Sequence, residues 1–199
     1  MLSIFRIVEI ESGRIIIDGE DIRNLGLDNL RKNIAMIPQS PTIFSGTIRS
    51  NLDPFGEYTD EDLWEAIDAT HLSAQINNFP EKLDASVSEG GSNLSVGTKQ
   101  LMCLARALLK KSKILIMDEA TANVDYETDV IIQTTIKKAF ANATVITVAH
   151  RINTILNYDK VMVLEKGKIS EFKNPQKLLS NPDSIFSSLA KESGIKNIL

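Results

Sequence analysis

The chain contains 199 residues, of which 43% are hydrophobic and 24% charged, so its composition is that of a folded globular protein and not of a low-complexity chain. A net charge of −4 disfavours nucleic acid as the main partner, because binding a polyanion depends on basic surface charge. The single cysteine, Cys103, excludes an intrachain disulfide, and the longest uncharged stretch, residues 34–48, is too short and too rich in proline to span a membrane.

The first 45 residues predict one helical segment and two strands. Residues 1–9 place Leu2 and Phe5 at helical spacing, so we expect the end of an amphipathic helix there. Residues 14–19 are rich in isoleucine and close with an Asp-Gly turn, which predicts a strand. Residues 34–37 form another apolar run that ends at a proline, and we predict a second strand over them.

Residues 46–111 are expected to form a helical lobe. Three acidic residues at 60–62 open a helix that continues through residue 67, and a second helix covers residues 98–109. Between residues 47 and 111 the sequence contains no run with the character of a strand.

Residues 112–199 alternate between strand and helix patterns. Strands are predicted over residues 113–117, 144–148 and 160–164, and helices near residues 126–140, 152–156, 176–179 and 184–191. The first of these strands lacks polar alternation, which is typical of a parallel sheet that is buried on both faces. We therefore predict a single α/β domain: residues 1–45 and 112–199 form a core with a mostly parallel sheet, and the α-helical lobe is inserted into it.

Two adjacent carboxylates follow the predicted strand over residues 114–117. Ligands of open α/β sheets bind outside the carboxyl ends of the strands, so Asp118 is placed to orient Mg²⁺ and Glu119 to polarise an attacking water. The alternative is a pair of surface acids at the start of the next helix.

A turn of small residues, Ser95-Val96-Gly97-Thr98, precedes the helix of the lobe. The N-terminus of a helix offers backbone N–H groups and a positive dipole end to an anion, although Ser95 could also be a simple helix cap. Order and spacing favour the anion site, because the helix leads to the strand with the two carboxylates. Residues 122–125 follow, and His150 ends the next strand.

Taken together, these motifs closely resemble the nucleotide-binding domain of ABC transporters, over nearly all of the chain. Gln39 resembles the glutamine of the Q-loop, and LSVGT at residues 94–98 resembles the signature motif. ILIMDE at 114–119 is similar to the Walker B strand with its catalytic glutamate, residues 122–125 to the D-loop, and His150 to the switch histidine. The strings NLDPF, VSEGG and CLARALL resemble the C-terminal nucleotide-binding domain of the multidrug-resistance-associated, C-type subfamily.

The resemblance implies a P-loop NTPase (RecA-like) core and MgATP as substrate. It implies catalytic roles for Glu119, His150 and Gln39, and Mg²⁺ contacts for Asp118 and Gln39. The implied contacts to a nucleotide are those of Ser95, Val96, Gly97, Thr98 and Asp125. On their own residue types, Gln39 would be a loop residue and His150 a histidine at a strand end. The implied partners are a second nucleotide-binding domain and the transmembrane domains of an exporter, which would hold this domain at the cytoplasmic face of a membrane.

The chain departs from the family pattern in two places. It contains no G-x-x-x-x-G-K-[ST] loop, and residues 4–9 resemble the second half of the helix after that loop, so we expect the loop and its strand to lie upstream of Met1. Thr98 stands where the subfamily usually has glutamine. An ATPase domain of an exporter is the leading interpretation, and we expect residues 1–199 alone to be inactive.

Two alternatives to the exporter remain open. One is a non-catalytic remnant or interaction module that pairs with another nucleotide-binding domain. The other is a soluble ABC-type ATPase of translation or DNA repair, which NLDPF and the acidic charge balance disfavour.

Overall fold

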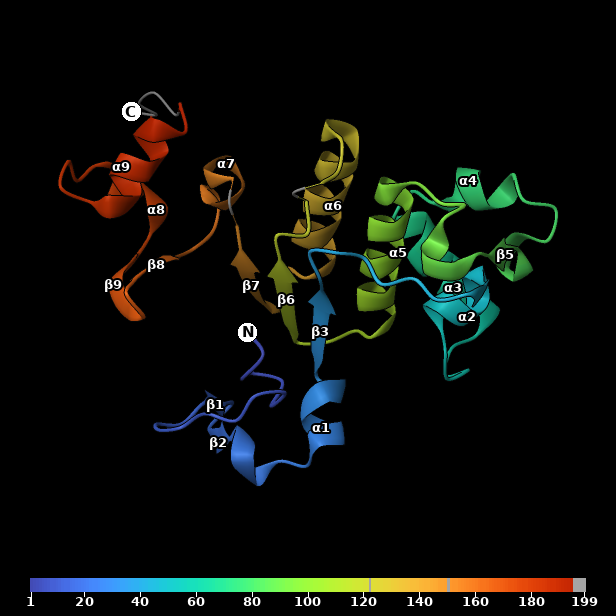
Figure 1. The fold of residues 1–199 in the computed structure, drawn as a ribbon, viewed down its shortest axis with the longest axis horizontal. Coiled ribbons are helices and arrows are strands. Elements are labelled where there is room, and N and C mark those ends of the chain that lie inside the picture. Colours follow the sequence, from blue (N-terminus) through green and yellow to red (C-terminus); the bar gives the residue numbers. More distant parts are fainter. Residues whose placement is uncertain (122, 150, 195–199) are drawn as a thin grey trace. The chain divides into compact units, whose positions relative to one another are not determined.

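A computed structural model describes residues 1–121, 123–149 and 151–194 of the chain (Figure 1). Two compact units are present, Met1–Val148 and Ala149–Leu199. The first unit contains a parallel sheet, as predicted, and its strands have the order β3 (Ile34–Ile37), β6 (Ile114–Asp118) and β7 (Thr144–Val148). Residues 46–111 contain the helices of the expected lobe, and the division into core and lobe stays a prediction.

Strand β6 lies in the middle of this sheet and is covered on both faces. Leu115 and Met117 belong to the large hydrophobic core under the helices, whereas Ile116 packs in a second core with Phe5 and Leu30. All three β6 side chains are at most 1% exposed. Alternate residues of a strand point to opposite faces, so the uninterrupted apolar run reflects burial on both sides.

Helices α2 (Ile48–Leu52), α3 (Asp60–Ala69), α4 (Ser73–Asn77) and α5 (Val96–Leu109) follow β3 in the chain. Helix α3 begins with a capping box between Thr59 and Asp62, which explains the acidic start that the sequence displays. Helix α6 (Tyr126–Ala139) connects β6 and β7. The expected absence of strands from residues 47–111 is wrong, because β4 (Gly46–Thr47) pairs antiparallel with β5 (Ser86–Val87). Two-residue strands are too short to display an alternating pattern.

The N-terminal segment differs from its prediction. Residues 1–7 form turns instead of the end of a helix, with Ile4 and Arg6 donating backbone N–H groups to the carbonyls three residues before them. Arg6 has a left-handed φ of 49°, and its guanidinium donates to the Ile22 and Leu25 carbonyls. This tertiary contact replaces the helix, since so short a helix has little stability of its own.

The predicted strand over residues 14–19 is a small hairpin. It is formed by β1 (Ile16–Ile17) and β2 (Glu20–Asp21) around the Asp-Gly turn. Helix α1 (Leu27–Lys32) then leads into β3. The described residues of the unit also contain 3₁₀ turns at Ile22–Asn24, Lys82–Asp84 and Glu89–Gly91.

The second unit contains α7 (Ile152–Ile155), β8 (Val161–Glu165), β9 (Lys168–Lys173), α8 (Pro175–Leu179) and α9 (Ile185–Glu192). Val161, Leu178 and Phe186 form its core. The sequence predicted β8 and the three helices but missed β9, which pairs antiparallel with β8 and has mostly exposed side chains. No helix among the described residues is long and apolar enough to cross a membrane.

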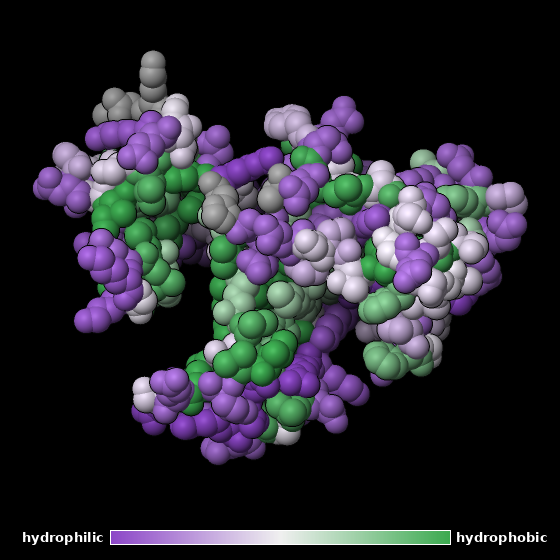
Figure 2. Space-filling view, in the orientation of Figure 1, coloured by the Kyte–Doolittle hydropathy of each residue, from purple (hydrophilic) through white to green (hydrophobic). Residues whose placement is uncertain are grey.

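Apolar side chains also remain on the surface of the first unit. Ile146 and Val148 of β7 are 38% and 41% exposed, and Leu2, Ile7 and Val8 of the N-terminal segment are at least half exposed. Figure 2 shows a hydrophobic surface in the middle of the view, where Figure 1 places β7 and the N-terminal segment. Among the described residues, β7 has a hydrogen-bonded neighbouring strand on one side only.

Candidate functional site

Three predicted site residues lie together at the carboxyl end of the parallel sheet. Strands β3 and β6 are neighbours in register, Ile37 opposite Met117, so the residues that follow each strand meet at the same edge. The Gln39 amide Nε2 donates a hydrogen bond to the Glu119 carboxylate Oε2 over 2.9 Å. Asp118 is the last residue of β6 and is half-buried beside Glu119. Residues 80 positions apart in the chain are thus joined at the edge where the sequence placed the site.

The backbone of Glu119 is held in an uncommon conformation. Its φ of 47° lies in the left-handed region, which few residues other than glycine adopt. Its N–H donates to the Val148 carbonyl at the end of β7 over 3.0 Å. A fixed, costly conformation of this kind is typical of functional positions, because the surrounding structure must maintain it.

The N-terminus of α5 carries the predicted signature residues. Ser95 caps the helix by accepting the Thr98 N–H over 3.0 Å, and Val96 is 49% exposed at the first helical position. The first N–H groups of a helix have no carbonyl partner within it, so this end of a 14-residue helix faces outward with donors available to an anion.

Gly97 packs against the start of α6. A Cβ atom added to Gly97 would lie 3.0 Å from Thr128 Oγ1 and 3.6 Å from Asp125 Oδ2. Asp125 caps α6 and accepts hydrogen bonds from the Thr128 N–H and hydroxyl, both over 2.9 Å. These hydrogen bonds, the backbone one first, lower the pKa of Asp125. Close packing against Thr128 inside the chain therefore favours glycine at position 97, a reason that the sequence did not reveal.

Gln100 is a site residue that the sequence analysis missed. Its side chain is 1% exposed and its Nε2 donates to the Pro38 carbonyl over 3.1 Å, directly beside Gln39. A pocket of about 310 Å³ lies between the two groups of site residues and is lined by Gln39, Val96, Gln100 and Asn123, among others. No local sequence signal marks Gln100, because its burial, and the need of a buried amide for a polar partner, become visible only in the fold.

The oxygen donors at the sheet edge fit Mg²⁺. This ion is commonly held by one or two carboxylates together with substrate phosphates, and not by a closed protein cage. The described residues contain no group of three or more His, Cys, Asp or Glu that could form such a cage. Asp118 supplies a carboxylate, and Gln39 carries an amide oxygen next to the nitrogen that donates to Glu119. His150 and Ala122 lie outside the described residues.

A larger pocket of about 640 Å³ is lined by residues of α1, of α2 and its flanking segments, and of α5, and no predicted site residue lines it. Its lining includes two exposed aromatic side chains, Phe44 at 65% and Phe55 at 83% exposure. Behind it, Arg106 of α5 donates to the Asn51 and Thr42 carbonyls and to the Asn51 side chain. Burial lowers the pKa of Arg106. We call this surface, with Phe44 and Phe55 on it, the lobe groove.

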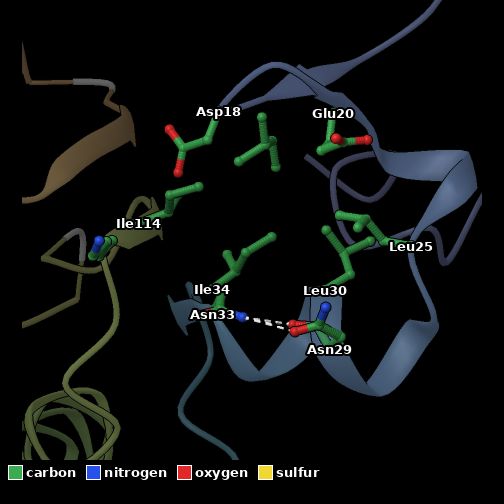
Figure 3. Close-up of a pocket in the computed structure, with 10 residues that line it drawn as sticks. Asp18, Glu20, Leu25, Asn29, Leu30, Asn33, Ile34 and Ile114 are labelled. Atoms are coloured by element: carbon green, nitrogen blue, oxygen red, sulfur yellow. Dashed lines mark hydrogen bonds between the residues drawn. The ribbon is translucent and has the colours of Figure 1, made fainter.

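A third pocket lies at the opposite end of the sheet (Figure 3). It has a volume of about 250 Å³ and is lined by Leu30, Ile34 and Ile114, with Asp18 and Glu20 on the hairpin above them. The Asn33 side-chain NH₂ on its wall donates to the backbone carbonyl and to the side-chain oxygen of Asn29. The pocket is far in the fold from the carboxyl ends of the strands and belongs to no predicted site.

The arrangement of sheet, lobe and site defines an α/β nucleotide-binding domain of the P-loop NTPase class. A bacterial Atm1-family ABC exporter solved with ATP bound matches 100% of the chain with a TM-score of 0.91 and 30% identity, and the match covers 35% of the exporter chain. The family model described as ABC transporter matches residues 1–122. The chain belongs to the ABC transporter family and is a nucleotide-binding domain of its C-type subfamily.

The curated relatives that match the chain are much longer proteins. ATP-binding cassette sub-family C member 2 is 53% identical over 195 residues in both Rattus norvegicus and Homo sapiens, covering 98% of this chain. ABC transporter C family member 12 of Dictyostelium discoideum is 50% identical over all 199 residues. The chain spans only 13–15% of the length of these relatives.

Proposed function

We propose that this chain supplies the catalytic glutamate and the signature surface of an ABC exporter, in which MgATP is hydrolysed at a composite interface with a second nucleotide-binding domain and drives transport. The observation that carries the proposal is the Gln39–Glu119 hydrogen bond beside Asp118. It brings an amide and two carboxylates to the edge of the sheet where phosphates bind in this class of fold.

Each site residue has a separate proposed task. Glu119 polarises the attacking water, and Asp118 and the Gln39 amide oxygen hold Mg²⁺, which would neutralise phosphate charge during the transfer. His150 donates a hydrogen bond to the γ-phosphate. The N-terminus of α5 and Asp125 contact the nucleotide that is bound to the partner domain; the α5 residues are Ser95, Val96, Gly97 and Thr98.

The lobe groove supports a transmembrane partner. Exposed aromatic side chains beside an apolar pocket are typical of protein interfaces, and the Atm1-family structure that matches the chain is an exporter. We propose that a cytoplasmic helix of the transmembrane domains occupies the lobe groove. This contact would hold the domain at the cytoplasmic face of the membrane.

Residues 1–199 alone are expected not to hydrolyse ATP. The 199 residues contain no G-x-x-x-x-G-K-[ST] loop, and phosphoryl transfer depends mainly on the preorganised phosphate contacts that such a loop makes. Phosphate release from MgATP by the purified chain measures this, with Glu119→Gln as the control for contaminating ATPases. ATP hydrolysis by the purified wild-type chain that is absent from the Glu119→Gln variant would contradict the expectation. If the chain pairs with an intact domain but the pair is inactive at both sites, the non-catalytic interaction module is favoured.

Val96→Asp is expected to weaken MgATP-dependent association with an intact nucleotide-binding domain at least about fivefold. An acidic residue in the first turn of α5 favours the helix dipole, so folding is preserved, yet it repels a phosphate at the same helix end. Val96→Asn adds a polar group of the same size without charge and serves as the control. Gly97→Asp is a poorer test because its Cβ would lie 3.0 Å from Thr128 Oγ1, so an effect on packing inside the chain would mix with the effect of the charge. If Val96→Asp leaves the MgATP-dependent affinity unchanged, residues 94–98 serve only as the start of α5 and do not contact the phosphate.

A further inference from the structure

Three polar groups form a chain of hydrogen bonds at the start of α5. Ser95 Oγ lies 2.8 Å from Thr98 Oγ1, and Thr98 Oγ1 donates to the Gln75 Oε1 of α4 over 3.0 Å. A hydroxyl group carries a single proton. Since the Thr98 proton is directed to Gln75, the proton in the Ser95–Thr98 contact must come from Ser95. The Ser95 hydroxyl therefore donates into the chain.

The three residues of this hydrogen-bond chain differ in their exposure to solvent. Ser95 is exposed, whereas Thr98 behind it is only 7% exposed, and Gln75 is exposed on the lobe. Ser95 also accepts the Thr98 N–H, so its donor and one acceptor site are both used internally. In this state the exposed hydroxyl cannot offer its proton to an outside oxygen without first breaking the bond to Thr98.

We propose that Thr98 and Gln75 are positioning residues for Ser95. They keep the Ser95 O–H in a hydrogen bond to Thr98 until an oxygen of the γ-phosphate on a partner domain accepts that hydrogen bond instead. The inference rests on the proposed function, because it assumes that the α5 N-terminus meets that phosphate. When the partner domain arrives, Ser95 rotates its O–H from Thr98 Oγ1 to a phosphate oxygen. Thr98 keeps its own donation to Gln75. Each association event thus breaks one neutral hydrogen bond, between Ser95 and Thr98. Thr98 and Gln75 therefore lower the affinity of the signature surface for the partner domain by the value of that bond.

The test measures the dissociation constant between residues 1–199 and an intact nucleotide-binding domain whose catalytic glutamate is replaced by glutamine, with MgATP or MgADP present. Thr98→Val removes the acceptor for the Ser95 proton and should tighten MgATP-dependent association about two- to tenfold, the value of one neutral hydrogen bond. MgADP-dependent association should not change, because ADP lacks the γ-phosphate. Thr98→Ser keeps the hydroxyl and should restore the original affinity.

Gln75→Met provides the same test at an exposed position, where folding is not at risk. Without its acceptor, the Thr98 hydroxyl can turn toward Ser95 and free the Ser95 proton, so association should again become tighter. Asn77→Met, an equally exposed change on the same helix with no contact to Thr98, is the matched control and should have no effect.

A double-mutant cycle separates this role from a structural one. In a Ser95→Ala background Thr98→Val should no longer change the affinity, because no proton is left to release. The inference is overturned if Thr98→Val and Gln75→Met leave the affinity unchanged, or if their effect persists without Ser95. If Ser95→Ala and Val96→Asp have no effect on MgATP-dependent association, the proposed function fails first, and the positioning role fails with it.

Discussion

Glu119→Gln is expected to lower ATP turnover about 10²–10⁴-fold when residues 1–199 follow the P-loop segment of a C-subfamily relative, a protein that we call the P-loop fusion. The side chain lies at the carboxyl end of β6 and accepts the Gln39 amide, so a glutamine of the same size fits the position. The substitution removes the negative charge that polarises water and leaves the shape of the site intact. Nucleotide affinity should therefore change little.

Turnover and nucleotide affinity are measured separately, by phosphate release and by equilibrium titration. Glu127→Gln is the matched control, because it removes an exposed carboxylate from the first turn of α6 and not the one that follows β6. A loss of nucleotide binding equal to the loss of turnover would reassign Glu119 to metal binding or to a structural role.

The position of the site at the carboxyl edge of the sheet could be predicted, because few structures are compatible with the sequence pattern of β6 and the two residues after it. An apolar run without alternation must be buried on both faces, and the two carboxylates that follow it must then lie at the carboxyl edge. The sequence could not show that the Gln39 amide reaches Glu119. That contact depends on β3 and β6 being adjacent and in register, and only the fold determines this.

Other features were hidden because their signals are tertiary. Gln100 and Asn51 are polar residues in helical segments, and nothing local distinguishes a buried polar residue from an exposed one. Strand β9 has an amphipathic pattern of mostly exposed residues, which an edge hairpin tolerates. The N-terminal segment has helical spacing, but Arg6 binds the carbonyls of residues 22 and 25 and the chain turns instead. In each case a contact distant in the sequence overrides the local preference.

Arg106 joins the lobe groove to α5 through hydrogen bonds. Asn51 is 2% exposed, and its side chain accepts the Phe44 N–H and donates to the Phe44 and Thr47 carbonyls. Arg106 holds Asn51 and the Thr42 carbonyl from the helix side. Hydrogen bonds through Asn51 and Arg106 therefore connect Phe44 in the lobe groove to the helix whose first turn carries the signature residues.

Arg106→Met is expected to lower the free energy of unfolding of the P-loop fusion by about 1–3 kcal/mol. Methionine fills most of the same volume, but the carbonyl and side-chain oxygens of Asn51, a residue that is 2% exposed, lose their charged donor, and buried acceptors without partners are costly. Part of this loss is offset because a partly buried charge with a lowered pKa no longer has to be desolvated. The measurement is urea unfolding followed by circular dichroism, with an unchanged dependence on urea as the sign of a simple stability effect.

Arg49→Met is the matched control for this prediction. Arg49 makes more formal ion pairs than Arg106, since it contacts the carboxylates of Asp60 and Asp84, but all three side chains are at least 36% exposed. Exposed ion pairs contribute at most about 1 kcal/mol, so Arg49→Met should cost less than Arg106→Met, although it removes two salt bridges. If the two variants lose the same free energy of unfolding, the buried network around Asn51 does not hold the lobe groove to α5. If Arg49→Met loses more than Arg106→Met, the surface ion pairs stabilise the lobe more than the buried network does.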